Sequence, residues 1–203
     1  MAMKKIAICQ RVDNFPQRGE SRDALDVRWG RLLWSMNLLP LPLCSWTIDP
    51  QTYLREIAPD GVILSGGGNP GEHPGRDALE KAMLDYAAGT RVPVLGICRG
   101  LQVMSRYQGG RSVQVQGHVA RRHLVSGSLI RGRREVNSFH HYSVRPEAPG
   151  KDLRVLARAE DGTVEALGHA FLPWLALMWH PEREEPADRS DLELIGKHLG
   201  GAL

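Results

Sequence analysis

Short runs of apolar residues alternate with helical patterns through the first half of the chain. Four of these runs have the length of buried strands. The predicted strands are Lys4–Gln10, Leu38–Leu43, Gly61–Leu64 and Val92–Ile97. Prolines in the second run favour an edge position or a strand end. Strands that alternate with helices predict a parallel sheet with right-handed crossovers and helices on both faces.

Apolar residues at helical spacing predict three helices in this half of the chain. The predicted helices are Arg22–Met36, Arg76–Ala88 and Leu101–Tyr107. The first has its apolar residues on one face and Ser21 as a candidate N-cap. The polar stretch from Arg11 to Ser21 contains proline and glycine, so it is predicted to be a loop.

The pattern of the second half is different. Between Arg111 and Gly168 the β-like runs are short and separated by glycine or proline, which predicts an antiparallel extension of the sheet. A buried strand at Leu175–Trp179 and a closing helix at Asp191–Leu199 are expected to follow. No internal repeat, linker or low-complexity stretch is visible, so we expect one α/β domain over residues 1–203.

A cysteine flanked by glycines follows the fourth predicted strand. Cys98 lies between Gly96 and Gly100, directly before a predicted helix. A sharp strand-to-helix turn needs small neighbours, and it projects its central side chain beyond the end of the strand. The helix N-terminus favours the thiolate, which is the reactive form. The pattern predicts a nucleophile, although free cysteines are also common as buried structural residues.

A histidine and a glutamate follow the last apolar strand, two residues apart. They are His180 and Glu182, and Pro181 keeps the residue before it extended. Side chains at positions i and i+2 of an extended segment point to the same side. A thiolate nucleophile needs a base and a group that orients the base. We expect Glu182 to bind one imidazole nitrogen and the other nitrogen to face the Cys98 sulfur.

A glycine run after the third predicted strand is the candidate oxyanion hole. The segment 65–68 (Ser-Gly-Gly-Gly) can turn backbone N–H groups toward a developing negative charge. The expected donors are the N–H groups of Gly67 and of Arg99, which follows the cysteine. A glycine run by itself is usually a tight turn. Because the carboxyl ends of parallel strands meet at one edge of a sheet, we expect these elements to converge.

Four motifs, G-I-C-R-G-x-Q, L-S-G-G-G-N-P, V-N-S-F-H-H and W-H-P-E, together resemble the class I glutamine amidotransferase-like hydrolases. The resemblance implies a flavodoxin-like, mostly parallel sheet with a small antiparallel extension. It implies a Cys-His-Glu triad at Cys98, His180 and Glu182, whose mechanism needs no metal or organic cofactor. The glutamyl-binding residues that it implies are Gln102 and the backbone of Asn137, Ser138, Phe139 and His140.

The residue after the cysteine separates branches of this family. Arg99 is similar to the γ-glutamyl hydrolases, which include hydrolases of γ-glutamyl-γ-aminobutyrate, whereas the glutaminases more often have an apolar or aromatic residue there. The short chain and its arginine-rich amino-terminal section resemble the branch that hydrolyses γ-glutamyl-CDP-amidate in capsule phosphoramidate synthesis. The resemblance therefore implies a small γ-glutamyl substrate, with a nucleotide-linked leaving group as one expectation and a γ-glutamyl-γ-aminobutyrate-type substrate of polyamine catabolism as the alternative.

Arginines dominate the cations of the chain, and guanidinium groups match carboxylate and phosphate oxygens. Arg11, Arg22 and Arg28 are candidate ligands of a diphosphate in the leaving group. Ion pairs with Asp23 and Asp26 are an equally good interpretation of these arginines.

The composition excludes several classes of protein. The 203 residues carry a net charge of +3, which is too weak to indicate nucleic-acid binding by itself. Cys9, Cys44 and Cys98 are widely spaced, so they suggest neither a zinc site nor a disulfide framework. The amino-terminal apolar run is too short for a signal peptide or membrane span. His118 and His123 lack metal-ligand support in the sequence and are assigned no role.

These features predict a cytoplasmic hydrolase with a small-molecule substrate and with no nucleic-acid or membrane partner. A homodimer is compatible with them. A glutaminase subunit that feeds ammonia to a partner synthase is one alternative, and its activity should rise when the partner is added. A silent binding module on the same fold is another, and it should lack a fast, pH-sensitive cysteine. The presence of all three residues Cys98, His180 and Glu182 argues against the silent module, because a silent protein does not need them.

Overall fold

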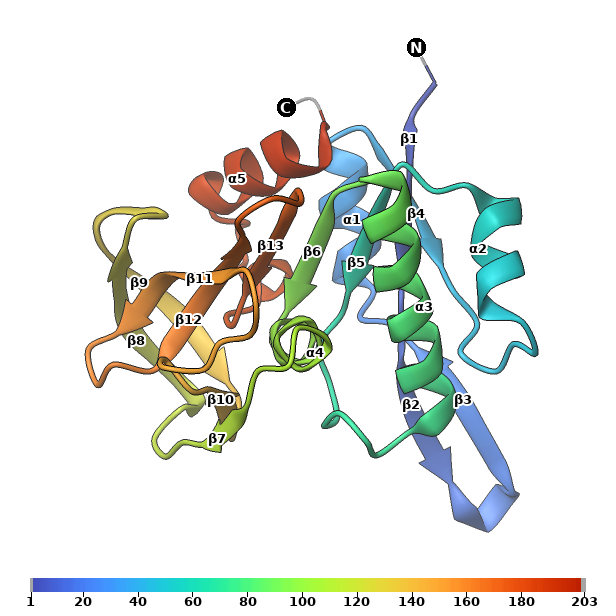
Figure 1. The fold of residues 1–203 in the computed structure, drawn as a ribbon, viewed down its shortest axis with the longest axis horizontal. Helices are drawn as coiled ribbons and strands as arrows, with labels where there is room; N and C mark the ends of the chain where they lie inside the picture. The colour runs from blue at the N-terminus through green and yellow to red at the C-terminus, as the bar shows by residue number, and fades with distance from the viewer. Residues whose placement is uncertain (1, 202–203) are drawn as a thin grey trace.

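A nine-stranded sheet runs through the protein, which we describe from a computed structural model over residues 2–201 (Figure 1). Five neighbouring strands are mutually parallel, in the order β4 (Leu38–Pro42), β1 (Lys4–Ile8), β5 (Gly61–Leu64), β6 (Val94–Ile97) and β13 (Trp174–Leu177). By chain order this is the 2-1-3-4-5 arrangement of flavodoxin-like folds. The prediction of a mostly parallel sheet with this topology is confirmed.

Four antiparallel strands extend the sheet beyond β13. In order, they are β12 (Val164–His169), β11 (Leu153–Ala159), β8 (Val119–Gly127) and β9 (Ile130–Phe139). A separate two-stranded sheet joins β7 (Ser112–Gln114) to β10 (Tyr142–Val144). The antiparallel extension was expected from the short β-like runs of this region.

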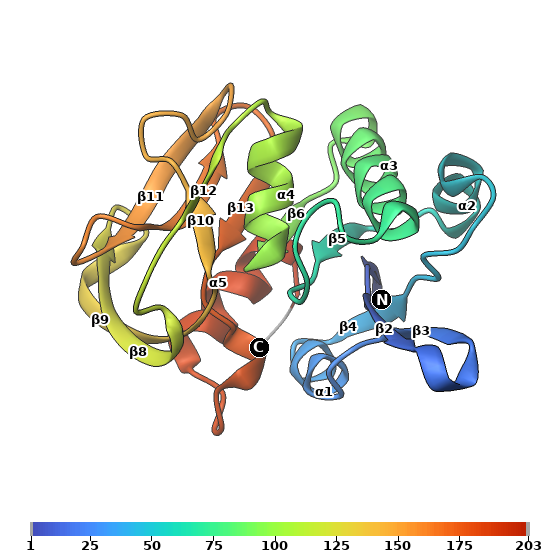
Figure 2. The ribbon, with the colours of Figure 1, turned by 90° about the horizontal axis from the view of Figure 1, so that it is seen from below.

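Helices cover both faces of the sheet (Figure 2). One face carries α1 (Arg28–Ser35) and α5 (Arg189–Leu199), and the other carries α3 (Pro74–Thr90) and α4 (Arg99–Tyr107), with α2 (Pro50–Ile57) beside α3. The central strands are apolar throughout and fully buried, as expected for parallel strands covered on both sides. This packing places the carboxyl ends of β1, β5, β6 and β13 along one edge.

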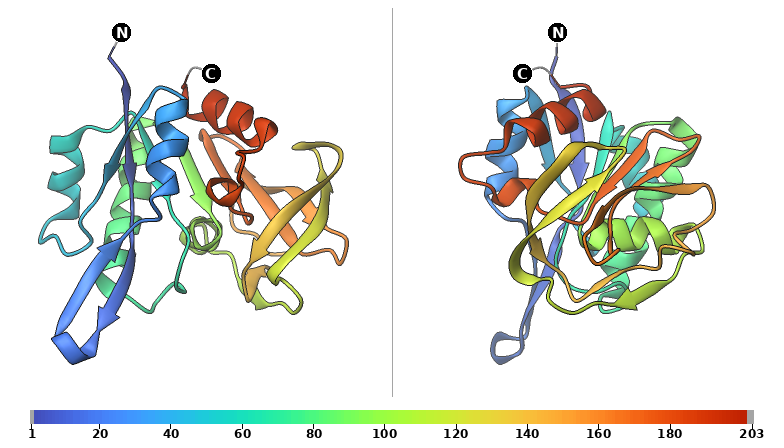
Figure 3. Two further views of the ribbon diagram at one scale, coloured as in Figure 1. Left: turned by 180° about the vertical axis from the view of Figure 1, so that it is seen from behind. Right: turned by 90° about the vertical axis from the view of Figure 1, so that its left-hand side faces the viewer.

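The amino-terminal region differs from the sequence prediction. Strands β2 (Arg11–Phe15) and β3 (Glu20–Ala24) form a hairpin that projects from the sheet (Figure 3), in place of a loop and the start of a helix. A short 3-10 helix, η1 (Pro16–Arg18), and Gly19 in the left-handed region (φ 62°) make the turn. Ser21 therefore lies in a strand and caps no helix.

Helix positions differ from prediction at two further points. Helix α2 was not predicted, although its start signal is present: Pro50 is its first residue, and the Asp49 carboxylate accepts a hydrogen bond from Thr52 N–H at 3.0 Å. Helix α4 begins at Arg99, two residues earlier than predicted, directly after the cysteine. The helix N-terminus therefore lies closer to Cys98 than the periodicity indicated.

Candidate active site

Cys98 lies in a strained turn between β6 and α4. Its backbone adopts φ 52° and ψ −100°, which is unusual for a residue with a side chain. The glycines on either side allow the turn. A Cβ at Gly100 would overlap the Leu64 carbonyl oxygen, and one at Gly96 would lie 2.8 Å from the Gly100 backbone. The G-x-C-x-G spacing thus has a steric cause, and it leaves the Cys98 side chain 7% exposed.

His180 and Glu182 follow β13 and form a close pair. The Nδ1 atom of His180 is 2.7 Å from Oε1 of Glu182, and both side chains are buried. Glu182 lies in the 3-10 helix η2 (Pro181–Arg183), which carries the carboxylate back to the imidazole. Burial lowers the pKa of His180, but interactions with Cys98 and Glu182 outweigh burial and raise this pKa to about 9. The imidazole is therefore protonated at neutral pH.

The side chain of Asn137 holds the His180 backbone. Its Nδ2 donates to the His180 carbonyl oxygen at 2.8 Å, and its Oδ1 accepts from the His180 N–H at 2.9 Å. This amide pair joins β9 to the segment after β13. The sequence resemblance implied only a backbone role for this segment, so the side-chain contact is a finding of the structure.

The glycine run after β5 packs against the same histidine. A Cβ at Gly66 would lie 2.7 Å from Cε1 of His180 and 3.6 Å from Cβ of Cys98. Gly67 has φ 91°, a conformation that residues with side chains rarely adopt. Within residues 2–201, its N–H donates to no backbone oxygen. Glycine is thus required here by close approach at one position and by conformation at the next.

The side chain of Arg76 in α3 binds the carbonyl oxygens of this loop. Its guanidinium donates to Ser65 at 2.8 Å, to Gly66 at 3.2 Å and to Gly67 at 2.6 Å. The carbonyl and the N–H of a trans peptide unit point in opposite directions. The N–H groups of these peptide units, including that of Gly67, therefore point away from Arg76. Sequence analysis did not find this residue.

A buried ion-pair network links the loop to the cysteine turn. The Glu80 carboxylate accepts from Arg76 Nε at 2.8 Å and from Arg99 Nη2 at 2.7 Å, and Arg99 also pairs with Asp77 at 2.7 Å. Cys9 donates to the same carboxylate at 3.2 Å, and burial together with Glu80 raises the Cys9 pKa to about 11. The Arg99 side chain is thus directed into the protein interior, and its backbone N–H lies in the first turn of α4, where no helical carbonyl can accept it.

The residues expected to bind a glutamyl group differ in their contacts and exposure. Gln102 Nε2 donates to the Tyr142 carbonyl oxygen at 2.9 Å, which fixes the orientation of its amide. Ser138 is fully buried, whereas Phe139 is 40% exposed and its ring lies 5.8 Å from the His180 ring. His140 is buried, and its Nε2 atom faces the Glu165 carboxylate at 3.4 Å.

The three candidate diphosphate ligands do not form one cluster. Arg11 lines a cleft of about 130 Å³ together with Gly67 and His180. Arg28 pairs with Asp26 at 2.6 Å, as one of the two interpretations expected. Arg22 pairs with Glu20 in the hairpin and lines a different pocket, so it does not form the ion pair expected with Asp23 or Asp26 on a helix. The physical reason is that Glu20 and Arg22 both lie in strand β3, where residues two positions apart point to the same face.

A second groove near His180 is strongly basic. It has a volume of about 580 Å³, and Phe139, whose ring lies 5.8 Å from the His180 ring, is part of its lining. We call this pocket the basic groove. The arginines in its lining are Arg28, Arg121, Arg122 and Arg183. Glu184, which pairs with Arg122 at 2.9 Å, is an acidic residue of its lining. Sequence analysis missed three of these arginines, although one of them follows the H-P-E motif directly.

Comparisons with known proteins identify the family and the relatives of this chain. A family model described as Peptidase C26 matches residues 31–182. The gamma-glutamyl-CDP-amidate hydrolase of Campylobacter jejuni subsp. jejuni is 32% identical over 188 residues, covering 88% of this chain and 90% of that protein. The carbamoyl phosphate synthase small chain of Staphylococcus haemolyticus is 33% identical over 160 residues, which are 73% of this chain but 42% of that protein.

Solved structures support the same fold. A glutamine amidotransferase from Thermotoga maritima superposes with a TM-score of 0.67 at 15% identity, covering 98% of this chain and 85% of that one. The sheet order and the elements at its carboxyl edge define a class I glutamine amidotransferase-like protein. The chain belongs to the Peptidase C26 family within that class, and its relatives support a hydrolase. None of the described helices has the length and apolar character needed to cross a membrane.

Proposed function

We propose that this chain is a cytoplasmic cysteine hydrolase that cleaves a γ-glutamyl amide and releases glutamate. The observation that carries the proposal is the strained turn of Cys98 beside an imidazole held 2.7 Å from a buried carboxylate. A nucleophile, a base and a group that orients the base are the minimum set for thiol catalysis. They lie where binding sites form in open α/β sheets, at the carboxyl ends of the strands.

In this mechanism the Cys98 sulfur attacks the γ-carbonyl carbon of the substrate. The N–H groups of Gly67 and Arg99 stabilise the oxyanion, and the loss of one such donor typically costs about 3–4 kcal/mol. His180, which is protonated at neutral pH, gives its proton to the departing nitrogen. Water then gives one proton to His180 and attacks the glutamyl thioester, so the Cys98 sulfur leaves as the thiolate, glutamate is released and the imidazolium is restored. Glu182 stabilises the imidazolium throughout.

The glutamyl half of the substrate is assigned to the side of Gln102 and β9. The amide of Gln102 is fixed by the Tyr142 carbonyl, so its position does not depend on the substrate. The backbone of segment 137–140 is held by Asn137 at one end and by His140, which contacts the Tyr142 carbonyl at 3.2 Å, at the other. This rigidity is what a subsite for a small, charged head group requires.

For the leaving group we propose a phosphate-bearing, nucleotide-linked amine, as in γ-glutamyl-CDP-amidate. Two observations support it: the name of the Campylobacter relative, and the basic groove beside Phe139. Guanidinium groups bind phosphate oxygens in a bidentate manner, and Arg121 is an exposed arginine that lines the groove. Arg11 faces the cleft at His180 and is a second candidate for this role, together with Arg28.

Glutamate release from γ-glutamyl amides with different leaving groups tests the substrate. The informative quantity is the ratio of kcat/KM for γ-glutamyl-CDP-amidate to kcat/KM for γ-glutamyl-γ-aminobutyrate. Arg121→Ala should lower this ratio about 10- to 150-fold, because a charge-assisted hydrogen bond contributes roughly 1.5–3 kcal/mol. The matched control is Arg133→Ala. Arg133 lies in β9, is exposed and pairs with Glu160, so this change should leave the ratio unaltered. A wild-type ratio below one would assign the enzyme to γ-glutamyl amine hydrolysis.

A glutaminase subunit is the second candidate function, favoured by the similarity to carbamoyl phosphate synthase small chains. Such a subunit would release ammonia from glutamine slowly and much faster with its synthase. The hydrolase proposed here should instead turn over its substrate fully without a partner. Substantial glutaminase activity together with inertness toward every γ-glutamyl amide tested would favour the glutaminase function.

A further inference from the structure

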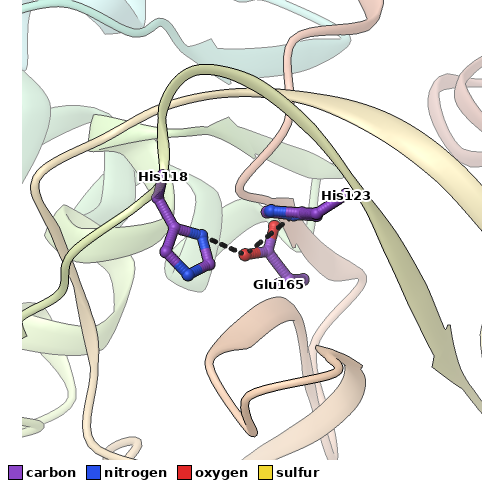
Figure 4. Close-up of side chains that lie close together, drawn as sticks. All are labelled: His118, His123 and Glu165. Atoms are coloured by element: carbon purple, nitrogen blue, oxygen red, sulfur yellow. Dashed lines mark ion pairs between the residues drawn. The ribbon is translucent and has the colours of Figure 1, made fainter.

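Three histidines and one glutamate converge outside the proposed active site, and Figure 4 shows two of the histidines, His118 and His123, with Glu165. They come from four segments: His118 precedes β8, His123 lies in β8, His140 follows β9 and Glu165 lies in β12. One carboxylate oxygen, Oε1 of Glu165, is 3.6 Å from His118 Nδ1, 3.3 Å from His123 Nε2 and 3.4 Å from His140 Nε2. Glu165 is fully buried, and His118 and His140 are at most 4% exposed.

The polar atoms that face one another in this cluster are unpartnered. Among the described residues, neither oxygen of Glu165 has a hydrogen-bond partner, and the same holds for the ring nitrogens of the three histidines that face it. Burying a carboxylate without hydrogen bonds costs several kcal/mol, so such groups are normally paired or bound to a metal ion. A metal ion at the centre of the cluster would supply both a positive charge and a partner for these atoms.

Contacts on the outer side of two imidazoles fix their tautomers. His118 Nε2 lies 2.8 Å from Oδ2 of Asp161, and His140 Nδ1 lies 3.2 Å from the Tyr142 carbonyl oxygen. Both partners can only accept, so these nitrogens carry the protons. In the neutral rings the inner nitrogens are then bare lone pairs that face a carboxylate oxygen. Metal-bound histidines show this arrangement, with the outer N–H held by a carboxylate or a carbonyl.

The nitrogen-to-oxygen distances in this cluster fit a transition-metal ion. The ligand atoms of His118, His123 and Glu165 all lie within 4.8 Å of one another. Zinc bonds to nitrogen and oxygen at tetrahedral angles place neighbouring ligand atoms about 3.3–3.6 Å apart, and the three nitrogen-to-oxygen distances agree with this. Imidazole with carboxylate favours zinc and similar first-row ions over Mg²⁺ or Ca²⁺.

We propose that His118, His123 and Glu165 bind a divalent first-row metal ion of the zinc type. The ion would join the segment of His118 and β8 to β12. Glu165 accepts through its backbone carbonyl from Met178 N–H at 2.8 Å, and Ser138 Oγ donates to the His118 carbonyl at 2.6 Å. The site would thus fix the substrate segment and the strand that leads to His180.

The test begins with metal content, which does not depend on activity. Untagged wild-type protein, expressed with zinc in the medium and dialysed into metal-free buffer, should retain about one equivalent of metal per chain by mass spectrometry of its elements. Removal with a strong chelator should lower Tm by about 5–15 °C, since the ion binds the folded state. Zn²⁺ should restore Tm and Mg²⁺ should not. Metal-free protein whose Tm does not respond to Zn²⁺ would overturn the proposal.

Variants locate the ion, because Cys98 and His180 could also bind zinc. His123→Gln and Glu165→Gln should lose the metal, whereas Cys98→Ala and the matched control His141→Gln, at the exposed neighbour of His140, should retain it. Co²⁺ substitution adds a readout that misfolding cannot mimic: visible bands of bound Co²⁺ without the thiolate charge-transfer band in the near ultraviolet. Metal loss in Cys98→Ala with retention in His123→Gln would place the ion at the active site and refute the assignment.

Discussion

The contact between His180 and Glu182 allows a quantitative prediction for Glu182→Gln. The pKa of His180 is raised from 6.5 to about 9, although burial alone would lower it. This difference corresponds to about 3 kcal/mol in favour of the charged imidazole in the folded state. Cys98 and Glu182 share this effect, so the glutamine variant should lose about 1–2 kcal/mol of it.

The direction with pH follows from the raised pKa. A histidine with a higher pKa in the folded state contributes stability that is complete below pH 6.5 and disappears as the pH rises through about 9. In wild type, the free energy of unfolding should therefore include this contribution at pH 6 and lack it above pH 9. Glu182→Gln should flatten this pH dependence, and its kcat/KM should fall off at a lower pH because His180 loses its proton earlier.

Urea unfolding at several pH values, with kcat/KM measured in the same buffers, checks both effects. Cys98→Ala with and without Glu182→Gln separates the contributions of the two partners in a double-mutant cycle. Glu193→Gln is the matched control, since this carboxylate forms an exposed ion pair with Arg189. If Glu182→Gln and the control change the pH dependence of unfolding equally, the imidazolium is not stabilised by Glu182, and our explanation of the site is wrong.

The remaining predictions concern the positions of atoms around the sulfur. Gly66→Ala should lower kcat more than about 100-fold without unfolding the protein, because the new Cβ would lie 2.7 Å from Cε1 of His180. The control Gly89→Ala, at a glycine with open space around it, should be fully active in the same assay. Arg76→Lys should lower kcat about 100-fold with little change in KM, since an ammonium group lacks the planar fork that binds the three loop carbonyls. An unchanged kcat would show that Arg76 does not position the oxyanion donors. Cys98→Ala should abolish glutamate release in a folded protein, and residual turnover would refute covalent catalysis.

Local patterns predicted the parts of the fold that depend on short stretches of sequence. The runs at Gly61–Leu64 and Leu38–Leu43 became β5 and β4, because buried central strands are continuous apolar segments and the prolines suit an edge. The prediction failed at the hairpin of β2 and β3, where pairing between the two strands and contacts with Ser45 outweighed the helical spacing. Tertiary contacts decide such weak local preferences.

The sequence by itself determined which residues lie at the active edge. Glycines at fixed distances from Cys98 are needed for one strained turn, and parallel strands bring their carboxyl ends together, so convergence with His180 could be inferred without coordinates. Only the tertiary structure decided what surrounds them. Arg76 and Glu80 support the glycine loop 65–68, the basic groove forms from separate elements, and His118 meets Glu165, because each of these sites joins segments distant in sequence. Periodicity describes neighbours within one element, whereas these contacts depend on how elements pack.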